Sequence, residues 1–397
     1  MKKVGIICEY NPFHNGHAYQ IGKIREQEQD AAIVCLMSGH ATQRGELAIA
    51  DKYTRASMAL SSGADLVLEL PYPYSSASAS YFAGAGVAIL DALAIDQLSF
   101  GSECADLSLI EKAAAVTQTA DFHAAVSARQ RAGEGSAHAY FEEMKKHLSD
   151  TACHLLSNDI LAVEYVRAVR ALDSEMVPLP LKRNGSAYTA ENIEDGKYPS
   201  ATALRRQLSA WDIHGSLRFC PEYSAEYLKK AIESGFSPVK TECLDAAILS
   251  FFRLHTPEEL SDIAEMQGGL AHRLCHAAHE SVSFSEMLTR ASSKSYPLAR
   301  VRRAVLFART GVKAEDLTCP PAYLSLLGAT ERGRQLLRDW KESSPIPIFA
   351  KFADAASLST AAGRQAELTV ALDSLFTLAQ PKPAAADHWI KMPPVLL

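Results

Sequence analysis

The sequence predicts an α/β fold: an open parallel sheet followed by a mostly helical C-terminal region. Four short apolar segments, 4–8, 31–37, 64–70 and 97–100, alternate with segments of helical periodicity. This alternation is typical of parallel strands joined by helices. Strand signals fade after about residue 220. Because 397 residues are too many for one compact core, we expect two domains, residues 1–219 and 220–397.

The first apolar segment, residues 4–8, is expected to be a buried strand. A turn follows it, and a helical pattern begins after Gly16. His14 and His17 therefore lie where a strand gives way to the N-terminus of a helix. Free backbone N–H groups and the helix dipole make such a junction an anion site, which suits the α- and β-phosphates of a nucleotide. A pair of surface loop histidines is the alternative interpretation of so short a pattern.

The next predicted elements continue the alternation. We expect helices at residues 48–62, with Gly63 just beyond the end, and at residues 76–93. A polar loop, residues 38–46, follows the second strand. Ligands of open parallel sheets bind at the carboxyl ends of the strands. The residues that fall at those ends are His14, His17, Gln43, Arg44 and Gly101.

Residues 120–172 have a helical pattern, in which Asn158 could cap a helix. Residues 176–183 predict a fifth strand that carries Arg183 at its end. Ser200 is a good N-cap for the helix that follows, and the hydroxyl and N–H groups there could donate to phosphate. Taken alone, this segment is better explained as an ordinary capped helix start.

Composition limits the classes of function. No apolar run approaches the roughly 20 residues of a membrane span, and the N-terminus lacks the pattern of a signal peptide, so we expect a cytoplasmic protein without a membrane partner. Eight scattered cysteines indicate reduced thiols. His272, Cys275, His276 and His279 are candidate metal ligands, and two histidines four residues apart can share a zinc ion, but no complete ligand set is evident and we expect no protein-bound metal. With a net charge of −6, nucleic-acid binding would need a local basic patch.

Two motifs point to one superfamily. His14-Asn15-Gly16-His17 resembles the H-x-G-H signature of the nucleotidylyltransferases, whose histidines bind ATP phosphates on a Rossmann-like sheet. Residues 200–205, SATALR, are similar to the S-[ST]-T-x-[IL]-R motif that closes the nucleotide site in that superfamily. The separation of the two motifs by nearly two hundred residues favours the functional interpretation of both.

Further segments narrow the resemblance to one family. SGHATQRGELA, GADLVLELP, FGSE, SNDILAVEY and LKRNG resemble segments of the bacterial tRNA(Met) cytidine acetate ligases. Members activate acetate with ATP as acetyl-adenylate and then acetylate N4 of the wobble cytidine (C34) of elongator tRNA(Met). The resemblance implies acetate and tRNA as partners, and ATP with Mg²⁺ held mainly by the phosphates as the cofactor.

The resemblance also implies roles for single residues. His14, His17 and Arg205 would be catalytic and would stabilise charge at the α-phosphate. His40 stands where the family usually has Asn, and Ala41-Thr42 replaces a Phe-containing pair, which matters if this loop lines the acetate pocket. The residues expected to contact ATP are Ile7, Cys8, Glu9, Tyr10, Asn11, Pro12, Phe13, His14, Asn15, Gly16, His17, Ala18, Tyr19, Gln20, Gly101, Asn158, Arg183, Asn184, Ser200 and Thr202.

The basic segment 293–303 is the predicted tRNA-binding region. Arginines suit phosphates, and Tyr296 could stack on a base. The alternative is an amphipathic helix with a solvated basic rim. The residues expected to bind tRNA are Lys294, Arg300, Arg302 and Arg303.

Two other functions share some of these features. A small-molecule adenylyltransferase that makes a dinucleotide or coenzyme precursor would have the N-terminal motifs but would not need the helical region with its arginines. A nucleotide-sensing RNA-binding module would have both regions and no activity. Release of pyrophosphate on addition of acetate would distinguish the ligase from both.

Overall fold

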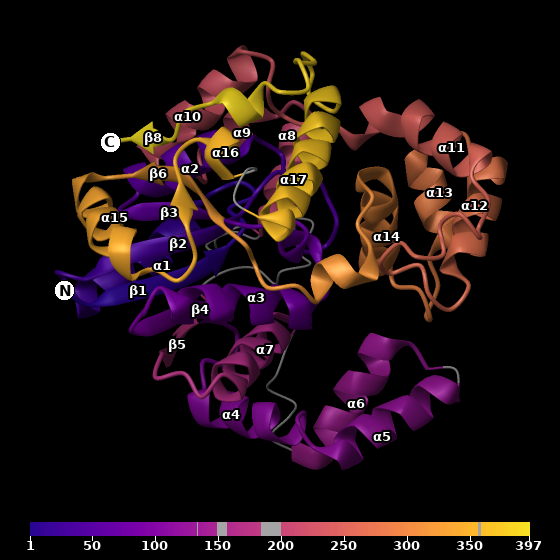
Figure 1. Ribbon diagram of the computed structural model, residues 1–397, viewed down its shortest axis with the longest axis horizontal. Helices are drawn as coiled ribbons and strands as arrows, with labels where there is room; N and C mark the ends of the chain where they lie inside the picture. The colour runs from indigo at the N-terminus through magenta and orange to yellow at the C-terminus, as the bar shows by residue number, and fades with distance from the viewer. Residues whose placement is uncertain (133, 149–156, 184–199, 356–358) are drawn as a thin grey trace.

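The protein is described from a computed structural model, in which residues 1–132, 134–148, 157–183, 200–355 and 359–397 are defined (Figure 1). Within these ranges eight strands form one sheet in the order β5-β4-β1-β2-β3-β6-β7, and β8 pairs with β6. β1 to β5 are mutually parallel, and β6 joins the edge antiparallel to β3. The strands are β1 (Lys3–Cys8), β2 (Ala32–Ser38), β3 (Leu66–Leu70), β4 (Gln97–Ser102), β5 (Val177–Lys182), β6 (Leu324–Ala329), β7 (Ile348–Phe349) and β8 (Val395–Leu396).

The predicted fold class is confirmed, and β1 to β5 lie where the apolar segments predicted them. β6, β7 and β8 were not predicted from the sequence. β7 and β8 are only two residues long, and β6 is a six-residue apolar segment between helices, so none has a strong local strand signal. The strands after residue 220 complete the same sheet, while the division at 219/220 stays a prediction.

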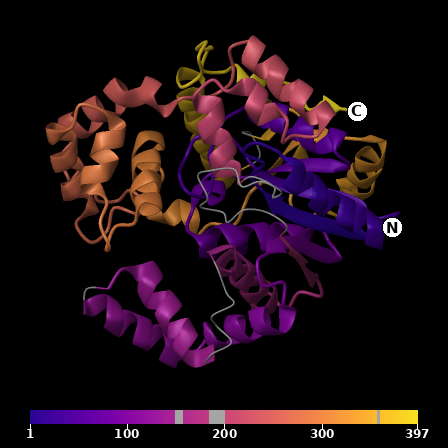
Figure 2. The same ribbon diagram turned by 180° about the vertical axis from the view of Figure 1, so that it is seen from behind.

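Helices cover both faces of the sheet (Figures 1 and 2). Alternate strand residues face opposite ways, so Ile6 and Cys35 pack in one layer while Ile7 and Leu36 pack in the other. The first layer contains α1 (Asn15–Gln27), α2 (Lys52–Ser61) and α10 (Glu222–Glu233). The second contains α3 (Ala79–Ala92), α4 (Leu107–Val116), α7 (Ser157–Ala171) and α15 (Glu331–Ser343).

Two helix starts differ from the prediction. α2 begins at Lys52 and not near residue 48, because the Asp51 side chain accepts a hydrogen bond from Thr54 N, 2.8 Å away, and so caps the helix there. α7 begins at Ser157, so Asn158 lies in its first turn and is not its N-cap. Gly63 follows α2 with a φ of +104°, as its predicted position beyond the helix end requires.

A second group of helices shares its own apolar core. In α14 (Leu298–Thr310) the predicted apolar face is buried, with Val301 and Ala304 both fully enclosed. The other members are α11 (Asp245–Leu254), α12 (Leu270–Glu280), α13 (Phe284–Ala291) and α17 (Thr360–Leu378). The remaining helices are α5 (Ala120–Arg131), α6 (Ser136–Leu148), α8 (Ala201–Ser209), α9 (Ile213–Leu217) and α16 (Phe352–Ala355). None of the described helices is long and apolar enough to cross a membrane.

Candidate active site

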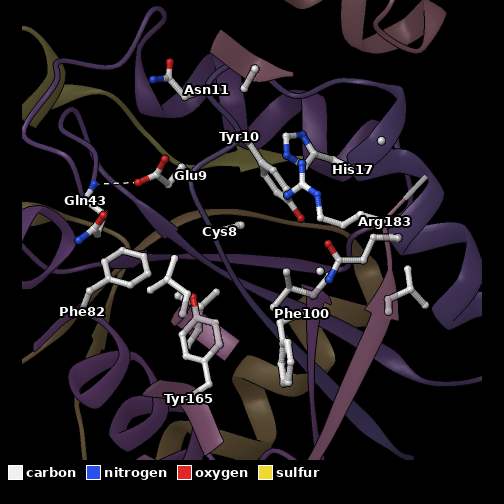
Figure 3. A pocket seen from close by; sticks show the side chains of 18 of the residues that line it. Cys8, Glu9, Tyr10, Asn11, His17, Gln43, Phe82, Phe100, Tyr165 and Arg183 are labelled. Carbon is white, nitrogen blue, oxygen red and sulfur yellow. Dashed lines mark hydrogen bonds between the residues drawn. The ribbon is translucent and has the colours of Figure 1, made fainter. Parts of the chain in front are cut away.

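A cavity of about 420 Å³ opens at the carboxyl ends of β1, β4 and β5 (Figure 3). From β1 the chain builds β2 and β3 on one side of the sheet, and then β4 on the other side. β1 and β4 therefore flank the point where the strand order reverses, which is where open α/β sheets bind ligands. His14 and His17 follow β1, and Gly101 lies near the end of β4, so the topology brings these predicted site residues together.

The two histidines are fixed by the first turn of α1. His14 is the N-cap, and its Nδ1 accepts a hydrogen bond from Gly16 N at 3.0 Å. His17 Nδ1 accepts from His14 N at 3.2 Å, and the two rings stack with centroids 3.8 Å apart. A neutral imidazole with an accepting Nδ1 carries its proton on Nε2. These hydrogen bonds therefore assign two Nε2–H donors to the N-terminus of α1.

Both histidines are neutral at neutral pH. Burial lowers the pKa of His14 to about 3, and the positive charges of Arg183 and Arg205 add to this effect. Burial also lowers the pKa of His17 well below its usual value, followed by the effects of His14 and Arg183. The histidines would therefore meet an anion as N–H donors, while Arg183 supplies positive charge.

Two aromatic side chains of the same segment, Tyr10 and Phe13, pack against the ring of His17. Phe13 is fully buried and Tyr10 is 2% exposed, with their ring centroids 4.8 Å apart. The ring of His17 lies 4.9 Å from that of Tyr10. Phe13 thus packs in the core and does not line the cavity, although it belongs to the segment expected to contact ATP.

The predicted ATP contacts fall into three groups, and their roles stay predictions. Those that line the cavity are Ile7, Cys8, Glu9, Tyr10, Asn11, His14, Gly16, His17, Tyr19, Gln20, Gly101 and Arg183. Among the described residues, those outside its lining are Pro12, Phe13, Asn15, Ala18, Ser200 and Thr202. Asn184 lies outside the described residues, as does the side chain of Asn158.

Part of the cavity wall was not predicted. Phe82 of α3, Phe100 of β4 and Tyr165 of α7 line it, together with Ile160 and Leu161. Each is an apolar or aromatic residue within a helix or strand, and such residues have the same sequence signature as core residues. Only their position at the carboxyl ends of the strands distinguishes them, and that position depends on tertiary packing.

The second predicted motif begins α8 beside the cavity. Ser200 is the N-cap, as predicted, and accepts from Ala203 N at 3.0 Å. Arg205 donates to Asn11 O at 2.9 Å and to Thr202 Oγ1 at 3.2 Å, and pairs with Glu46 at 3.3 Å. Arg205 thus connects α8 to the turn after β1, close enough to lower the pKa of His14.

Comparison with known proteins agrees with this geometry. The family model of the HIGH nucleotidyl transferases matches residues 1–388. A tRNA(Met) cytidine acetate ligase of Acetivibrio thermocellus is 33% identical in an alignment that covers 97% of this chain and 96% of that one. The chain belongs to the tRNA(Met) cytidine acetate ligase family. A member from Thermoanaerobacter sp. (strain X514) is 32% identical over 88% of each chain.

Solved structures of a member of this family have the same fold. Thermotoga maritima TmcAL in its apo form superimposes with a TM-score of 0.93 at 29% identity. The same protein bound with α-thio ATP gives a TM-score of 0.91 at 28% identity. Each comparison covers 100% of both chains.

His40, one of the predicted departures from the usual pattern of these ligases, does not line the cavity. It is fully buried, with Nδ1 2.6 Å from Asp373 Oδ1 and its ring stacked on Phe376 of α17. Lys52 completes the cluster, 3.1 Å from Asp373 Oδ2 and 3.0 Å from Glu69 Oε2. His40 therefore joins the loop to α17, and the loop instead contributes Gln43 and Arg44 to the cavity wall.

The predicted tRNA-binding arginines of this ligase family member are already paired within the chain. Arg302 pairs with Glu46, while Arg300 and Arg303 both pair with Glu265 at 3.3 and 2.8 Å. Arg303 is 8% exposed and lines the cavity, so it does not belong to a solvated rim. In the same segment Lys294 is exposed. The hydroxyl of Tyr296 donates a hydrogen bond to Gly268 O.

Proposed function

We propose that this protein activates acetate with ATP as acetyl-adenylate and then transfers the acetyl group to N4 of the wobble cytidine of elongator tRNA(Met). The observation that carries the proposal is the pair of Nε2–H donors of His14 and His17 at the switch point of the sheet. The names of the relatives support the choice of acetate and of tRNA(Met).

In the activation step an acetate oxygen attacks the α-phosphorus of ATP, and pyrophosphate leaves. The protein would contribute mainly positioning and stabilisation of developing charge, as phosphoryl chemistry requires. His14 and His17 are placed to donate to phosphate oxygens, and Arg183 supplies positive charge on the same side of the cavity. The absence of a side chain at Gly101 leaves room for Arg183, because a Cβ there would lie 3.3 Å from Arg183 Cγ.

We propose that Mg²⁺ enters with ATP and is held by the phosphates and water. The described residues contain no group of three or more metal-ligating side chains, which is compatible with the few protein ligands that Mg²⁺ needs in nucleotide sites. Mg²⁺ would neutralise part of the charge of the triphosphate.

The acetyl pocket must be small, because one methylene changes binding by only about 1–3 kcal/mol and longer acids must be excluded sterically. The loop that carries Gln43 is our candidate for one wall of this pocket. An unpaired anticodon base can be turned into such a cavity. A tRNA substrate also implies a cytoplasmic reaction.

A screen of carboxylates for ATP-dependent pyrophosphate release tests the activation step. We expect release with acetate, weak release with formate or propionate, and none with butyrate. Release with a nucleoside monophosphate and none with any carboxylate would instead identify a small-molecule adenylyltransferase. No release with any substrate would favour a nucleotide-sensing binding module.

A further inference from the structure

The cavity has two chemically different halves (Figure 3). In the figure His17 and Arg183 lie on one side, where N–H donors and a positive charge suit phosphates. Glu9 and Gln43 lie on the other side, above Phe82 and Tyr165. A carboxylate repels a triphosphate, so the second half suits the acceptor better than it suits ATP, and Glu9 is set apart here from the ATP contacts expected for its segment.

The carboxylate of Glu9 is held in a fixed position. Its Oε1 accepts from Gln43 N at 2.7 Å, and the Gln43 side chain is itself anchored by a 3.0 Å hydrogen bond to Ala77 O. The backbone carbonyl of Glu9 accepts from Arg55 at 2.7 Å, and Arg55 is fully buried. In the part of the chain that the structure describes, Glu9 Oε2 has no hydrogen-bond partner.

The surroundings of Glu9 are partly apolar and carry a few charges. Burial raises the pKa of Glu9 above its usual value, although the Gln43 N–H group and Arg205 act in the opposite direction. Burial also raises the pKa of Tyr165 on α7, and the charge of Glu9 adds to this. The other charged or titratable groups around Glu9 are Arg44 and Glu46 on the loop, Arg55 on α2, Arg303 on the cavity wall and Cys8 on its own strand.

Aromatic side chains give this half of the cavity an apolar lining. Phe82 is 2% and Tyr165 5% exposed, and the rings of Phe100 and Tyr165 lie 5.7 Å apart. Aromatic walls bind bases by stacking, and a nearby carboxylate accepts a hydrogen bond from an exocyclic amine. A cytosine whose N4 amine points at Glu9 satisfies both features.

We propose that Glu9 is the general base for acetyl transfer, a role that rests on the function proposed above. N4 of the cytidine forms a bond to the acetyl carbonyl carbon, and the bond from that carbon to the AMP oxygen breaks. AMP leaves with the electron pair, and one N4 proton passes to Glu9 Oε2. Such bases contribute about 10²–10⁴-fold, and a carboxylate held near apolar side chains is a stronger base than a solvated one.

The Glu9→Gln variant tests this role, because the amide oxygen can still accept from Gln43 N. Enzyme would be incubated with ATP, Mg²⁺ and labelled acetate, the adenylate measured, and unmodified elongator tRNA(Met) then added in a single-turnover assay. We expect the transfer rate to fall at least ~100-fold more than the rate of adenylate formation. In the wild type the transfer rate should fall as the pH decreases through the pKa of Glu9, and Glu9→Gln should lack this acidic limb. Glu9→Asp should retain the limb.

Four outcomes would overturn the assignment. Equal losses in both steps would mean that Glu9 acts in ATP binding or folding, and recovery at higher Mg²⁺ would identify it as a metal ligand. An unchanged transfer rate with an unchanged acidic limb would contradict the base role alone. If the wild type itself labels no tRNA, the proposed function fails and the base role fails with it.

Discussion

His14 and His17 each use Nδ1 to bind a backbone N–H group, which leaves Nε2–H as the donor toward the cavity. The same contacts that begin α1 therefore fix the tautomer of both side chains. Because burial keeps the imidazoles neutral, we expect their contribution to phosphate binding to be a directed hydrogen bond, with Arg183 providing the positive charge.

We expect His14→Ala and His17→Ala each to reduce adenylate formation by at least ~100-fold, the scale for losing one preorganised donor. Pyrophosphate release with acetate measures this. His276→Ala is the control, since the His276 side chain on α12 is 75% exposed. Near-normal rates in both active-site variants would remove these histidines from the reaction.

The lowered pKa of His14 predicts a pH dependence of stability. Between the ordinary value of about 6.5 and the folded value of about 3, the unfolded chain binds a proton that the folded chain does not. Stability should therefore fall as the pH decreases below about 6.5, by at most about 1.4 kcal/mol per pH unit from this residue. His14→Asn keeps an N-cap acceptor and should show a shallower loss in denaturant unfolding between pH 7 and 5. Parallel curves for the two proteins would contradict the lowered pKa.

Some residues of the cavity could be predicted from the sequence and others could not. His14 and His17 were predicted because two side chains of rare type sit at a fixed spacing beside a strand and a helix. Phe82 and Tyr165 were not, because a wall residue and a core residue have the same local pattern. The contact between His40 and Asp373 joins residues 333 positions apart, and no local signal reports such a pairing.

At the scale of elements, the loop after β2 connects three parts of the molecule. Glu46 pairs with Arg205 on α8 and with Arg302 on α14. Gly45 has a φ of +75° and packs against the backbone of α14, where a Cβ would lie 2.6 Å from Arg303 N. The loop thus joins α8 to the basic segment of α14.

The Gly45→Ala variant should lose more than about 1 kcal/mol of stability, because the backbone is left-handed and α14 would have to move. Gly22→Ala is the matched control, since Gly22 lies within helix α1 and a Cβ there meets nothing within 4 Å. We expect Gly22→Ala to raise the free energy of unfolding by up to about 1 kcal/mol. The denaturant midpoint of each variant is compared with that of the wild type. Similar midpoint shifts for Gly45→Ala and Gly22→Ala would show that the loop does not approach α14 closely.

Element prediction succeeded where a segment carries its own pattern. β1 to β5 are apolar segments separated by helices, and their local sequence predicts them. β6 pairs with β3 across more than two hundred residues, and its register depends on that partner. The start of α2 depends on which polar residue caps it, and Asp51 could be chosen only from its hydrogen bond to Thr54.

In the whole molecule, residues from both predicted parts meet at one cavity. Arg303 of α14 lies on the wall that β1, β4 and β5 build, and β6 to β8 complete their sheet. Arg300, Arg302 and Arg303 are engaged in ion pairs, so changing any one of them would also remove one of the two ion pairs of Glu46 or Glu265. Lys294 is a cleaner probe of tRNA contact because it is exposed.

We expect Lys294→Ala to weaken binding of tRNA(Met) and to reduce the log–log salt slope by about one, the effect of one lost phosphate contact. Adenylate formation without tRNA should be unaffected. Lys341→Ala, an exposed lysine on α15, is the control. A salt slope equal to that of the wild type would place the tRNA elsewhere.

The ligase assignment is tested most directly by following one labelled acetyl group. Enzyme, ATP, Mg²⁺ and labelled acetate are mixed, and acetyl-adenylate is sought by chromatography before and after addition of unmodified elongator tRNA(Met). We predict that the adenylate forms without tRNA, that tRNA consumes it, and that nuclease digestion recovers the label as N4-acetylcytidine from the wobble position. An adenylate that forms but leaves that cytidine unlabelled would contradict the assigned acceptor, and the absence of any acetyl-adenylate would contradict the account as a whole.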